Sequence, residues 1–283
     1  MKENFSDRIN KLRSLLEDAE CVLIGGGSGL SSAAGLTYSG KRFTANFGDF
    51  IALYDLTDMY SAGFYPFKTQ EEKWAYWSRH ILLNRWQPSA LPLYKTLLGI
   101  VGDKDCFVIT TNVDAQFYKA GFDPDRIFAV QGDYGKLQCA KGCHDTLYDN
   151  ESLVRRMAVE QRDCRIPSSL VPKCPVCGGE AEVNIRKDIY FVQDKAWYEA
   201  ARRYESFRDK ARGKKTVLLE LGVGYNTPTI IRFPFERMVY ENDDVYLVRV
   251  NRQYGGAIPE NAEKTLSFDE DISLVLSELS RHS

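Results

Sequence analysis

The sequence has almost no net charge. It contains 37 lysines and arginines against 39 aspartates and glutamates, which gives a formal net charge of −2. This balance provides no general attraction to nucleic acid or to an anionic membrane, so a charged partner would have to be recognised by a local patch. We therefore expect no nucleic acid among its partners.

Long apolar runs are also lacking. No stretch approaches the length that is needed to cross a bilayer, and the amino-terminal residues MKENFSDRINKLRSLLEDAE have no apolar signal core. We expect a cytoplasmic protein with no membrane partner. The content of 44% hydrophobic and 27% charged residues is ordinary for a globular chain, which is long enough for one large domain or for a large and a small one.

Seven cysteines are present, an odd number in a chain without an export signal. This favours reduced thiols and a metal site over a disulfide framework. Cys21, Cys106 and Cys164 are predicted to be spare thiols, the first two buried in strands.

The hydrophobic pattern predicts an α/β protein with two insertions. Ile9, Leu12, Leu15 and Leu16 lie on one face of a first helix, which precedes a strand at 21–24 and a glycine-rich turn. Further strands are predicted at 106–111, 127–130, 189–192, 217–221 and 245–250, and further helices at about 195–212 and 272–279. The segment 41–93 is rich in aromatics with little alternation, and is expected to form a helical lid or pocket wall in which packing is the default role of the rings.

We therefore predict a Rossmann-like parallel sheet with a helical insertion and a small zinc-binding module. The sheet domain is assigned to residues 1–40, 94–134 and 180–283, the insertion to 41–93 and the module to 135–179.

The glycine-rich turn GGGSGLSS starts at Gly25 and stands between a strand and a helix. Such a loop allows backbone N–H groups to approach a pyrophosphate closely, and the amino end of the helix favours the negative charge. Tight packing is the alternative use of these glycines.

Polar residues follow two other strands where those strands end. The run Phe107 to Ile109 changes into Thr110, Thr111, Asn112 and Asp114, and the run 127–130 ends in Gln131-Gly132. Polar tips of this kind at the carboxyl ends of parallel strands favour a ligand site at the switch point of the sheet. The alternative for Asn112 and Asp114 is an Asx turn that ends the strand.

Four cysteines have the spacing of a metal site. Cys139-x3-Cys143 and Cys174-Pro-Val-Cys177-Gly-Gly form two knuckles, and four thiolates imply tetrahedral Zn²⁺. A closed site of this kind has no open position for water, so the ion would be structural. The alternatives are a redox dithiol and unliganded cysteines. His144 is predicted to be a surface residue rather than a ligand.

These motifs resemble the sirtuin family, in which TQNID, a catalytic His-Gly and a cysteine zinc module occur in this order. Gly27-Ser28-Gly29-Leu30-Ser31 and Gly35-Leu36 match the first part of the family's cofactor loop, whereas 37–40 replaces its Pro-Asp-Phe-Arg part. Gln131 stands in the place of the catalytic histidine. The sequence contains only His80, His144 and His282, none of them next to such a glycine. The closest resemblance is therefore to the class M sirtuins, the macrodomain-linked microbial branch with Gln at this position.

The resemblance implies NAD⁺ as a substrate. It assigns catalytic roles to Asn112, Gln131 and Arg186, with Asp114 ordering the same pocket. Val223 and Gly224 lack two hydroxyls that the family has, so Asn226 and Thr227 are expected to replace those contacts. The implied cofactor contacts are Gly27, Ser28, Gly29, Ser31, Gly35, Asn112, Asp114, Gln131, Gly222, Val223, Asn226, Asn251, Asp271 and Ile272.

The expected chemistry depends on what a glutamine cannot do. An amide can orient a nucleophile but cannot accept a proton near neutral pH, so an acceptor that is already ionised is favoured. This predicts mono-ADP-ribosylation of a protein carboxylate rather than lysine deacylation. Arg186 is a candidate to hold that carboxylate; its alternative is a solvated surface arginine.

The resemblance also implies the biological partners. The acceptor would be a glycine-cleavage H-like carrier protein that bears a lipoyl group, an operon-encoded macrodomain would reverse the modification, and the setting would be oxidative stress. An NAD⁺ sensor without turnover and an NAD⁺ hydrolase are the rival interpretations, and lysine deacylation is the least favoured.

Overall fold

The computed structural model describes residues 4–281, so His282 lies outside the described residues. The chain divides into two compact units. Unit 1 consists of Met1–Ala34, Ala90–Gln131 and Ala196–Ser283, and unit 2 consists of Gly35–Ser89 and Gly132–Lys195.

Unit 1 is built on a six-stranded sheet in which every neighbouring pair is parallel. The spatial order is β3 (Ile127–Ala129), β2 (Asp105–Thr110), β1 (Cys21–Gly26), β7 (Thr216–Leu221), β8 (Val245–Val250) and β9 (Thr265–Phe268). The strand order reverses between β1 and β7, which is the switch point of a Rossmann-like sheet. The predicted sheet is confirmed.

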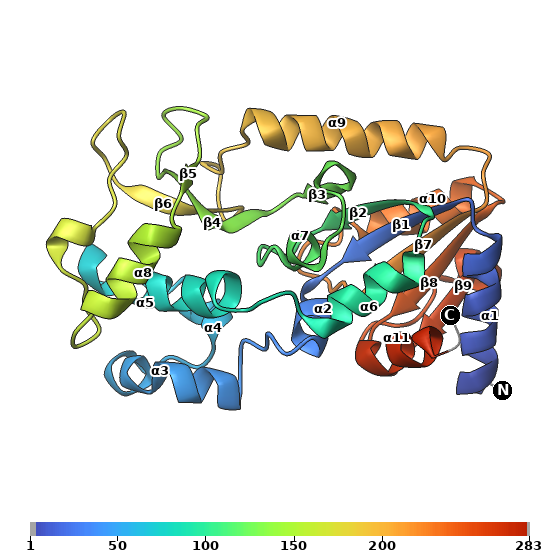
Figure 1. Ribbon diagram of the computed structural model, residues 1–283, viewed down its shortest axis with the longest axis horizontal. Coiled ribbons are helices and arrows are strands. Elements are labelled where there is room, and N and C mark those ends of the chain that lie inside the picture. The colour runs from blue at the N-terminus through green and yellow to red at the C-terminus, as the bar shows by residue number, and fades with distance from the viewer. Residues whose placement is uncertain (1–3, 282–283) are drawn as a thin grey trace. The chain divides into compact units, whose positions relative to one another are not determined.

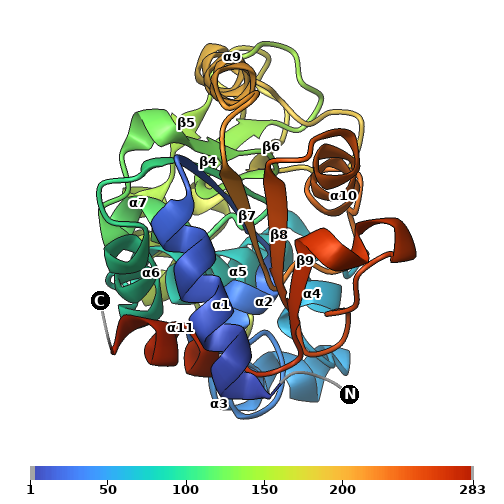
Figure 2. The same cartoon turned by 90° about the vertical axis from the view of Figure 1, so that its right-hand side faces the viewer.

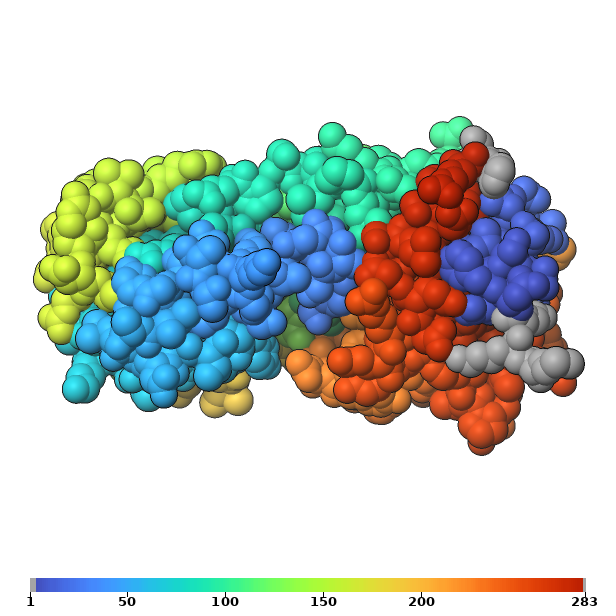
Figure 3. Space-filling model, turned by 90° about the horizontal axis from the view of Figure 1, so that it is seen from below, coloured from blue at the N-terminus to red at the C-terminus, as the bar shows by residue number. Residues whose placement is uncertain are grey.

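Helices cover both faces of this sheet, as the fully buried strands require. Helices α1 (Phe5–Asp18), α6 (Pro92–Val101) and α11 (Ile272–Ser280) pack into one apolar core, and α9 (Lys195–Lys210) and α10 (Arg232–Glu241) pack into the other. Figure 2 shows α10 on one side of β7, β8 and β9, with α1 and α11 on the other. In the space-filling view of Figure 3, α11 in red lies against α1 in blue.

Short elements complete unit 1. They are α2 (Ser28–Ala33), α7 (Gln116–Ala120), η2 (Pro124–Arg126) and η4 (Pro259–Lys264). No helix among the described residues has both the length and the apolar character that a membrane span requires.

Unit 2 combines helices with a small antiparallel sheet, and its α-helices and strands are labelled in Figure 1. The strand order is β5 (Tyr148–Asp149), β4 (Gly132–Cys139) and β6 (Ala181–Ile185). The helical elements are α3 (Lys41–Tyr54), α4 (Met59–Ala62), α5 (Gln70–Ile81), η1 (Leu82–Trp86), α8 (Glu151–Glu160) and η3 (Ser168–Leu170).

The segment 41–93 is helical, as predicted, and most of its rings form a buried aromatic core. Phe47, Phe50, Trp74 and Tyr76 are fully buried, whereas Tyr60 remains 57% exposed. Rings such as Phe47 and Tyr76 pack with centroids 5.2 Å apart, so packing is the main role of this segment.

The helical insertion and the cysteine module are distant in sequence but belong to the same compact unit. Lys73 of α5 forms an ion pair of 2.6 Å with Glu182 of β6. The Trp86 Nε1–H of η1 donates to Asn150 Oδ1 at 2.9 Å. These side-chain contacts join the helical insertion to the cysteine module, which the sequence pattern predicts as two separate parts.

The strand predicted at 189–192 is wrong. This β-type run is a loop that follows β6, and Ile189 is 90% exposed. The buried Gln138 amide holds the loop, because its Nε2 donates to Tyr190 O at 2.8 Å and its Oε1 accepts from Val192 N at 3.0 Å. Among the predicted spare thiols, Cys21 is buried as expected, whereas Cys106 is only half-buried.

We predict that His80 makes the fold sensitive to acid. This side chain of α5 is buried, and its burial and the charge of Arg42 lower its pKa from 6.5 to about 3. Below about pH 6.5 this histidine is protonated in the unfolded chain but stays neutral in the folded protein. The free energy of unfolding therefore decreases as the pH falls from 6.5 towards 3. Urea titrations between pH 7 and pH 4 should show a loss of unfolding free energy on the order of 3 kcal/mol from this residue.

The variant His80→Phe should flatten this acid-dependent part of the profile. Ser78→Ala, on the same buried helix, retains the titrating imidazole and serves as the matched control. Equal acid sensitivity in both variants would contradict the assignment to His80.

Candidate functional site

The carboxyl ends of β1 and β7 touch through their backbones. Gly27 N–H donates to Leu221 O and Gly29 N–H donates to Gly222 O, both at 3.0 Å. A Cβ on Gly27 would lie 2.5 Å from Gly222 O, so a side chain cannot be accommodated there. The packing use of these glycines is therefore confirmed. The phosphate contact stays a prediction, with Ser28 exposed at the first position of α2.

Asn112 is held between the ends of β1 and α6. Its Nδ2 donates to Gly27 O at 2.9 Å and to Tyr94 Oη at 3.3 Å, and its backbone N–H donates to Thr110 Oγ1 at 3.0 Å. Because both amide hydrogens are engaged, Oδ1 is the group with which this side chain can accept a hydrogen bond from a ligand.

A buried chain of hydrogen bonds continues from Tyr94 to Asp114. Ser31 Oγ donates to Asp114 Oδ2 at 2.5 Å, so in the 2.8 Å contact between Ser31 and Tyr94 the phenol must be the donor. Burial, and secondly the charge of Asp114, raise the pKa of Tyr94 well above its usual value, so the phenol remains protonated. Asp114 Oδ1 also accepts from Gln116 N at 2.9 Å.

These hydrogen bonds bring together four predicted site residues from different sequence motifs: Gly27, Ser31, Asn112 and Asp114. Tyr94 is the member that sequence reasoning missed. It stands in the apolar pattern of α6, where a tyrosine gives no signal of a polar role. Ala115 has left-handed backbone angles directly after Asp114, with φ of 58°. An L-residue held in this conformation is characteristic of a tightly specified site.

Gln131 follows β3 at the same edge of the sheet, where Val130 N–H donates to Thr110 O at 3.0 Å. Its side chain is half-buried, and its Oε1 is a buried atom without a hydrogen-bond partner within residues 4–281. An unsatisfied buried acceptor is costly, so a donor from a bound molecule would stabilise this site.

The loops after β7 and β8 contain the next group of predicted contacts. Asn251 Nδ2 donates to Val223 O at 2.8 Å, and Asn251 Oδ1 accepts from Gln253 N and Tyr254 N at 3.0 Å. The Asn251 amide therefore ties the two loops together and has its oxygen fully occupied. Asn226 is exposed.

Asp271 and Ile272 begin α11. Asp271 is the N-cap and accepts from Ser273 N at 2.8 Å, and the hydrogen bond from the Ser273 side chain lowers the pKa of Asp271. The Ile272 side chain is buried in the apolar core. The Asp271 side chain thus caps a helix and the Ile272 side chain packs in the core, whereas their predicted contact with NAD⁺ stays a prediction.

Two of the predicted catalytic and cofactor residues belong to unit 2. Gly35 is exposed with φ of 102°. Arg186 is exposed and follows Ile185, which pairs with Gly132 in the small sheet. A Cβ on Gly132 would lie 2.1 Å from Asn184 O, which explains the glycine after Gln131.

The four cysteines of unit 2 form one cluster. Their sulfur atoms all lie within 4.8 Å of one another, with Cys139 to Cys177 at 3.8 Å and Cys143 to Cys174 at 3.6 Å. Tetrahedral zinc with Zn–S bonds of about 2.3 Å requires sulfur separations of about 3.8 Å, so the set fits Zn²⁺. Backbone N–H donation, first of all from Cys143, lowers the pKa of Cys139, whereas the hydrogen bond with Cys139 raises the pKa of Cys143, so the thiols of the cluster titrate together.

His144 differs from its prediction as a surface residue. It is half-buried, its Nδ1 lies 3.1 Å from Cys143 Sγ, and its Nε2 lies 2.9 Å from Tyr148 Oη. The four cysteines already complete a tetrahedral ligand set. The His144 ring packs against this set and contacts Cys143 and Tyr148.

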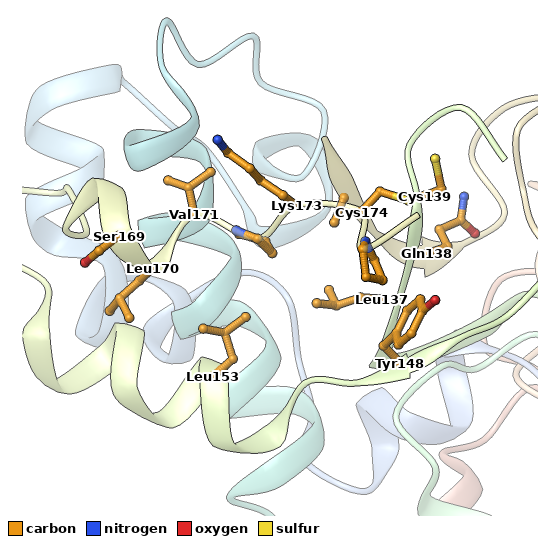
Figure 4. Close-up of a pocket in the computed structure, with 13 residues that line it drawn as sticks. Leu137, Gln138, Cys139, Tyr148, Leu153, Ser169, Leu170, Val171, Lys173 and Cys174 are labelled. Atoms are coloured by element: carbon orange, nitrogen blue, oxygen red, sulfur yellow. The ribbon is translucent and has the colours of Figure 1, made fainter. Parts of the chain in front are cut away.

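A cavity of about 350 Å³ opens beside this cluster within unit 2. Figure 4 shows Leu153, Leu170 and Val171 on one side of it and Tyr148 on the other. Cys139 and Cys174 contribute to its wall, so the cavity depends on the folded cysteine module.

Comparison with known proteins gives matches in sequence and in fold, although no protein-family model matches the chain. A protein ADP-ribosyltransferase from Staphylococcus aureus is 37% identical over 94% of this chain and 85% of its own length. A probable bifunctional ADP-ribose hydrolase/ADP-ribosyltransferase from Fusarium oxysporum f. sp. cubense is 32% identical over 89% of this chain, which spans only 43% of that protein.

Solved structures share the fold at low sequence identity. Sir2Tm bound to a propionylated peptide matches with a TM-score of 0.58 and 18% identity, over 97% of this chain and 98% of the other. A Sir2 homologue in complex with NAD matches with a TM-score of 0.59 and 15% identity, over 96% of this chain and 93% of the other.

We predict that Tyr94→Phe lowers the unfolding free energy by about 1–2 kcal/mol, because it leaves Ser31 and Asn112 without a shared buried partner. Denaturant titration measures this loss. Tyr60→Phe, at an exposed tyrosine, is the matched control and should be neutral. An equal effect of both changes would contradict the role of the hydrogen-bond chain.

We also predict one zinc ion per chain, held by the four cysteines. Elemental analysis should show loss of the metal in Cys177→Ser and its retention in Cys106→Ala. Chelation should unfold the cysteine module, because metal binding and folding are coupled. Full metal content in Cys177→Ser would contradict the assigned ligand set.

Proposed function

The chain belongs to the family of NAD-dependent protein ADP-ribosyltransferases with the sirtuin fold, and on this premise we propose that it transfers ADP-ribose from NAD⁺ to a carboxylate of a lipoylated, glycine-cleavage H-like carrier protein. Nicotinamide is the leaving group of this transfer. The proposed setting is the oxidative-stress response in the cytoplasm.

The observation that carries the proposed acceptor chemistry is the glutamine at position 131. Its Oε1 is buried and without a partner among the described residues, yet an amide cannot remove a proton from a ribose hydroxyl near neutral pH. It can accept a hydrogen bond and thereby orient a ligand. An acceptor that arrives already ionised needs no base, which favours an aspartate or glutamate over a hydroxyl or an amine.

The neighbouring ionisable groups support this interpretation. Tyr94 remains protonated because burial raises its pKa, and Asp114 is engaged by Ser31 and by the Gln116 N–H. Both groups serve to hold Asn112, whose Oδ1 has no partner among residues 4–281 and is suited to accept a hydrogen bond from a ribose hydroxyl. We assign Asn112 and Asp114 to the orientation of NAD⁺, and neither to proton removal.

Arg186 is the proposed partner of the acceptor carboxylate. Its guanidinium is exposed on unit 2 and could hold a carboxylate through two parallel hydrogen bonds. Gln131 and Arg186 stand next in sequence to Gly132 and Ile185, which pair with each other.

The relative from Fusarium supports a reversible modification, since its name joins an ADP-ribose hydrolase to an ADP-ribosyltransferase. We propose that a separate macrodomain hydrolase removes the ADP-ribose which this chain attaches.

The test is mass spectrometry of lipoylated and unmodified H-like carrier protein after incubation with the enzyme and NAD⁺. We expect a hydroxylamine-sensitive ADP-ribose adduct on the carrier, and a rate that is about 10²-fold lower in Asn112→Ala and in Gln131→Ala. Gln87→Ala, at an exposed glutamine of unit 2, is the control and should retain the parent rate.

The other outcomes separate the rival functions. Consumption of NAD⁺ to free ADP-ribose without an adduct would make the chain a hydrolase. Binding without consumption would make it a sensor, and acyl-ADP-ribose from an acylated peptide would make it a deacylase. An adduct on the unmodified carrier as well would remove the requirement for the lipoyl group.

A further inference from the structure

Two loops of unit 1 contain four of the predicted NAD⁺ contacts. The β7 loop, residues 222–231, contains Gly222, Val223 and Asn226, and the β8 loop, residues 251–258, contains Asn251. These loops leave the ends of neighbouring strands, so their relative placement sets the shape of any nucleotide site between them.

Below these loops lies a buried group of four charged side chains, Glu220, Arg232, Glu236 and Arg249, which we call the charge quartet. Glu220 of β7 and Arg249 of β8 are register partners, and both side chains have no exposed surface. Arg249 Nε and Nη2 donate to the two oxygens of Glu220 at 2.7 Å and 2.9 Å. Arg249 Nη2 also donates to Glu236 of α10 at 2.9 Å.

Stability alone is a weak reason for such a group. The two positive and the two negative charges of the quartet neutralise each other, but removing them from water has a large desolvation cost. Apolar residues of similar volume often give equal stability. A role in fixing a particular geometry accounts better for charges at this place.

Both arginines extend from the quartet to backbone carbonyls of the β8 loop. Arg249 Nη1 donates to Gly256 O at 2.8 Å. Arg232 Nη1 and Nη2 donate to Tyr254 O at 3.2 Å. The loop is therefore attached to the sheet and to α10 at two points that are independent of Asn251.

Arg232 also contacts the β7 loop. Its guanidinium lies over the ring of Tyr225, with 4.4 Å from Cζ to the ring centroid. That ring in turn packs edge-to-face on Tyr254, with centroids 4.9 Å apart. One side chain of 4% exposure thus joins the anions of the quartet, a carbonyl of one loop and a ring of the other. A planar guanidinium can make these contacts at once, whereas an ammonium group cannot.

We propose that Arg232 is a positioning residue for NAD⁺, which acts by fixing the β7 and β8 loops relative to each other. This inference rests on the proposed function. Loops that are held in the bound arrangement before NAD⁺ arrives avoid an ordering cost on binding. Loss of Arg232 therefore weakens NAD⁺ binding and leaves the chemical step at saturation unchanged.

The test compares Arg232→Lys and Tyr225→Leu with the parent enzyme. Calorimetry measures the Kd for NAD⁺, and nicotinamide release measures KM and kcat. We expect Kd and KM to rise about tenfold in Arg232→Lys and less in Tyr225→Leu, with kcat within about twofold of the parent. Tyr240→Leu, at an exposed tyrosine on the same helix, is the matched control and should change neither constant.

A lower melting temperature in Arg232→Lys with an unchanged Kd would overturn the proposal and make the quartet purely structural. If Arg232→Lys does not fold, Tyr225→Leu decides, because half of that ring is exposed and its loss leaves the quartet intact. A parent enzyme that binds NAD⁺ without transferring ADP-ribose would disprove the proposed transfer, while the calorimetric comparison would still decide the role of Arg232.

Discussion

Close backbone contact between the ends of β1 and β7 is the constraint on which the rest of the site depends. Gly27 and Gly29 lie against Gly222, where a Cβ would approach backbone atoms to less than 3 Å. On the other side of β1, Gly27 O accepts from Asn112 Nδ2, and Asn112 connects to Tyr94. Three positions in two distant segments therefore lack a side chain where these backbones approach each other, next to the polar groups of the site.

The polar groups at the same edge of the sheet bear on the chemistry that the site can perform. Two ionisable groups are connected to Asn112: burial raises the pKa of Tyr94, which stays protonated, and Asp114 accepts from Ser31 and from the Gln116 N–H. The remaining polar group, Gln131, is an amide. An amide at this position can orient a reacting group but cannot deprotonate one near neutral pH, which is the physical basis of the acceptor chemistry proposed above.

The buried strands are the part of the fold that the sequence predicts best, because a parallel strand covered on both faces needs an unbroken apolar run. The cysteine spacing likewise predicts the cluster, since few other uses place two knuckles in one chain. The prediction of a strand at 189–192 failed because the composition of this run is typical of a strand. In the structure the buried amide of Gln138, which is distant in sequence, holds the run as a loop. The role of Tyr94 and the pairing of Glu220 with Arg249 depend on register and on helix placement, which no local pattern encodes.

The chain passes between the two units at 34–35, 89–90, 131–132 and 195–196, so unit 1 is assembled from three separate segments. During synthesis β1 emerges first, followed by residues 35–89 of unit 2 and then by β2 and β3. Residues 132–195 complete unit 2, and β7, β8 and β9 emerge last. The growing chain must therefore keep a half-sheet with the β7-pairing edge of β1 unpaired while residues 132–195 of unit 2 are made. In this topology the half-sheet thus exposes a pairing edge to other chains until β7 has been made.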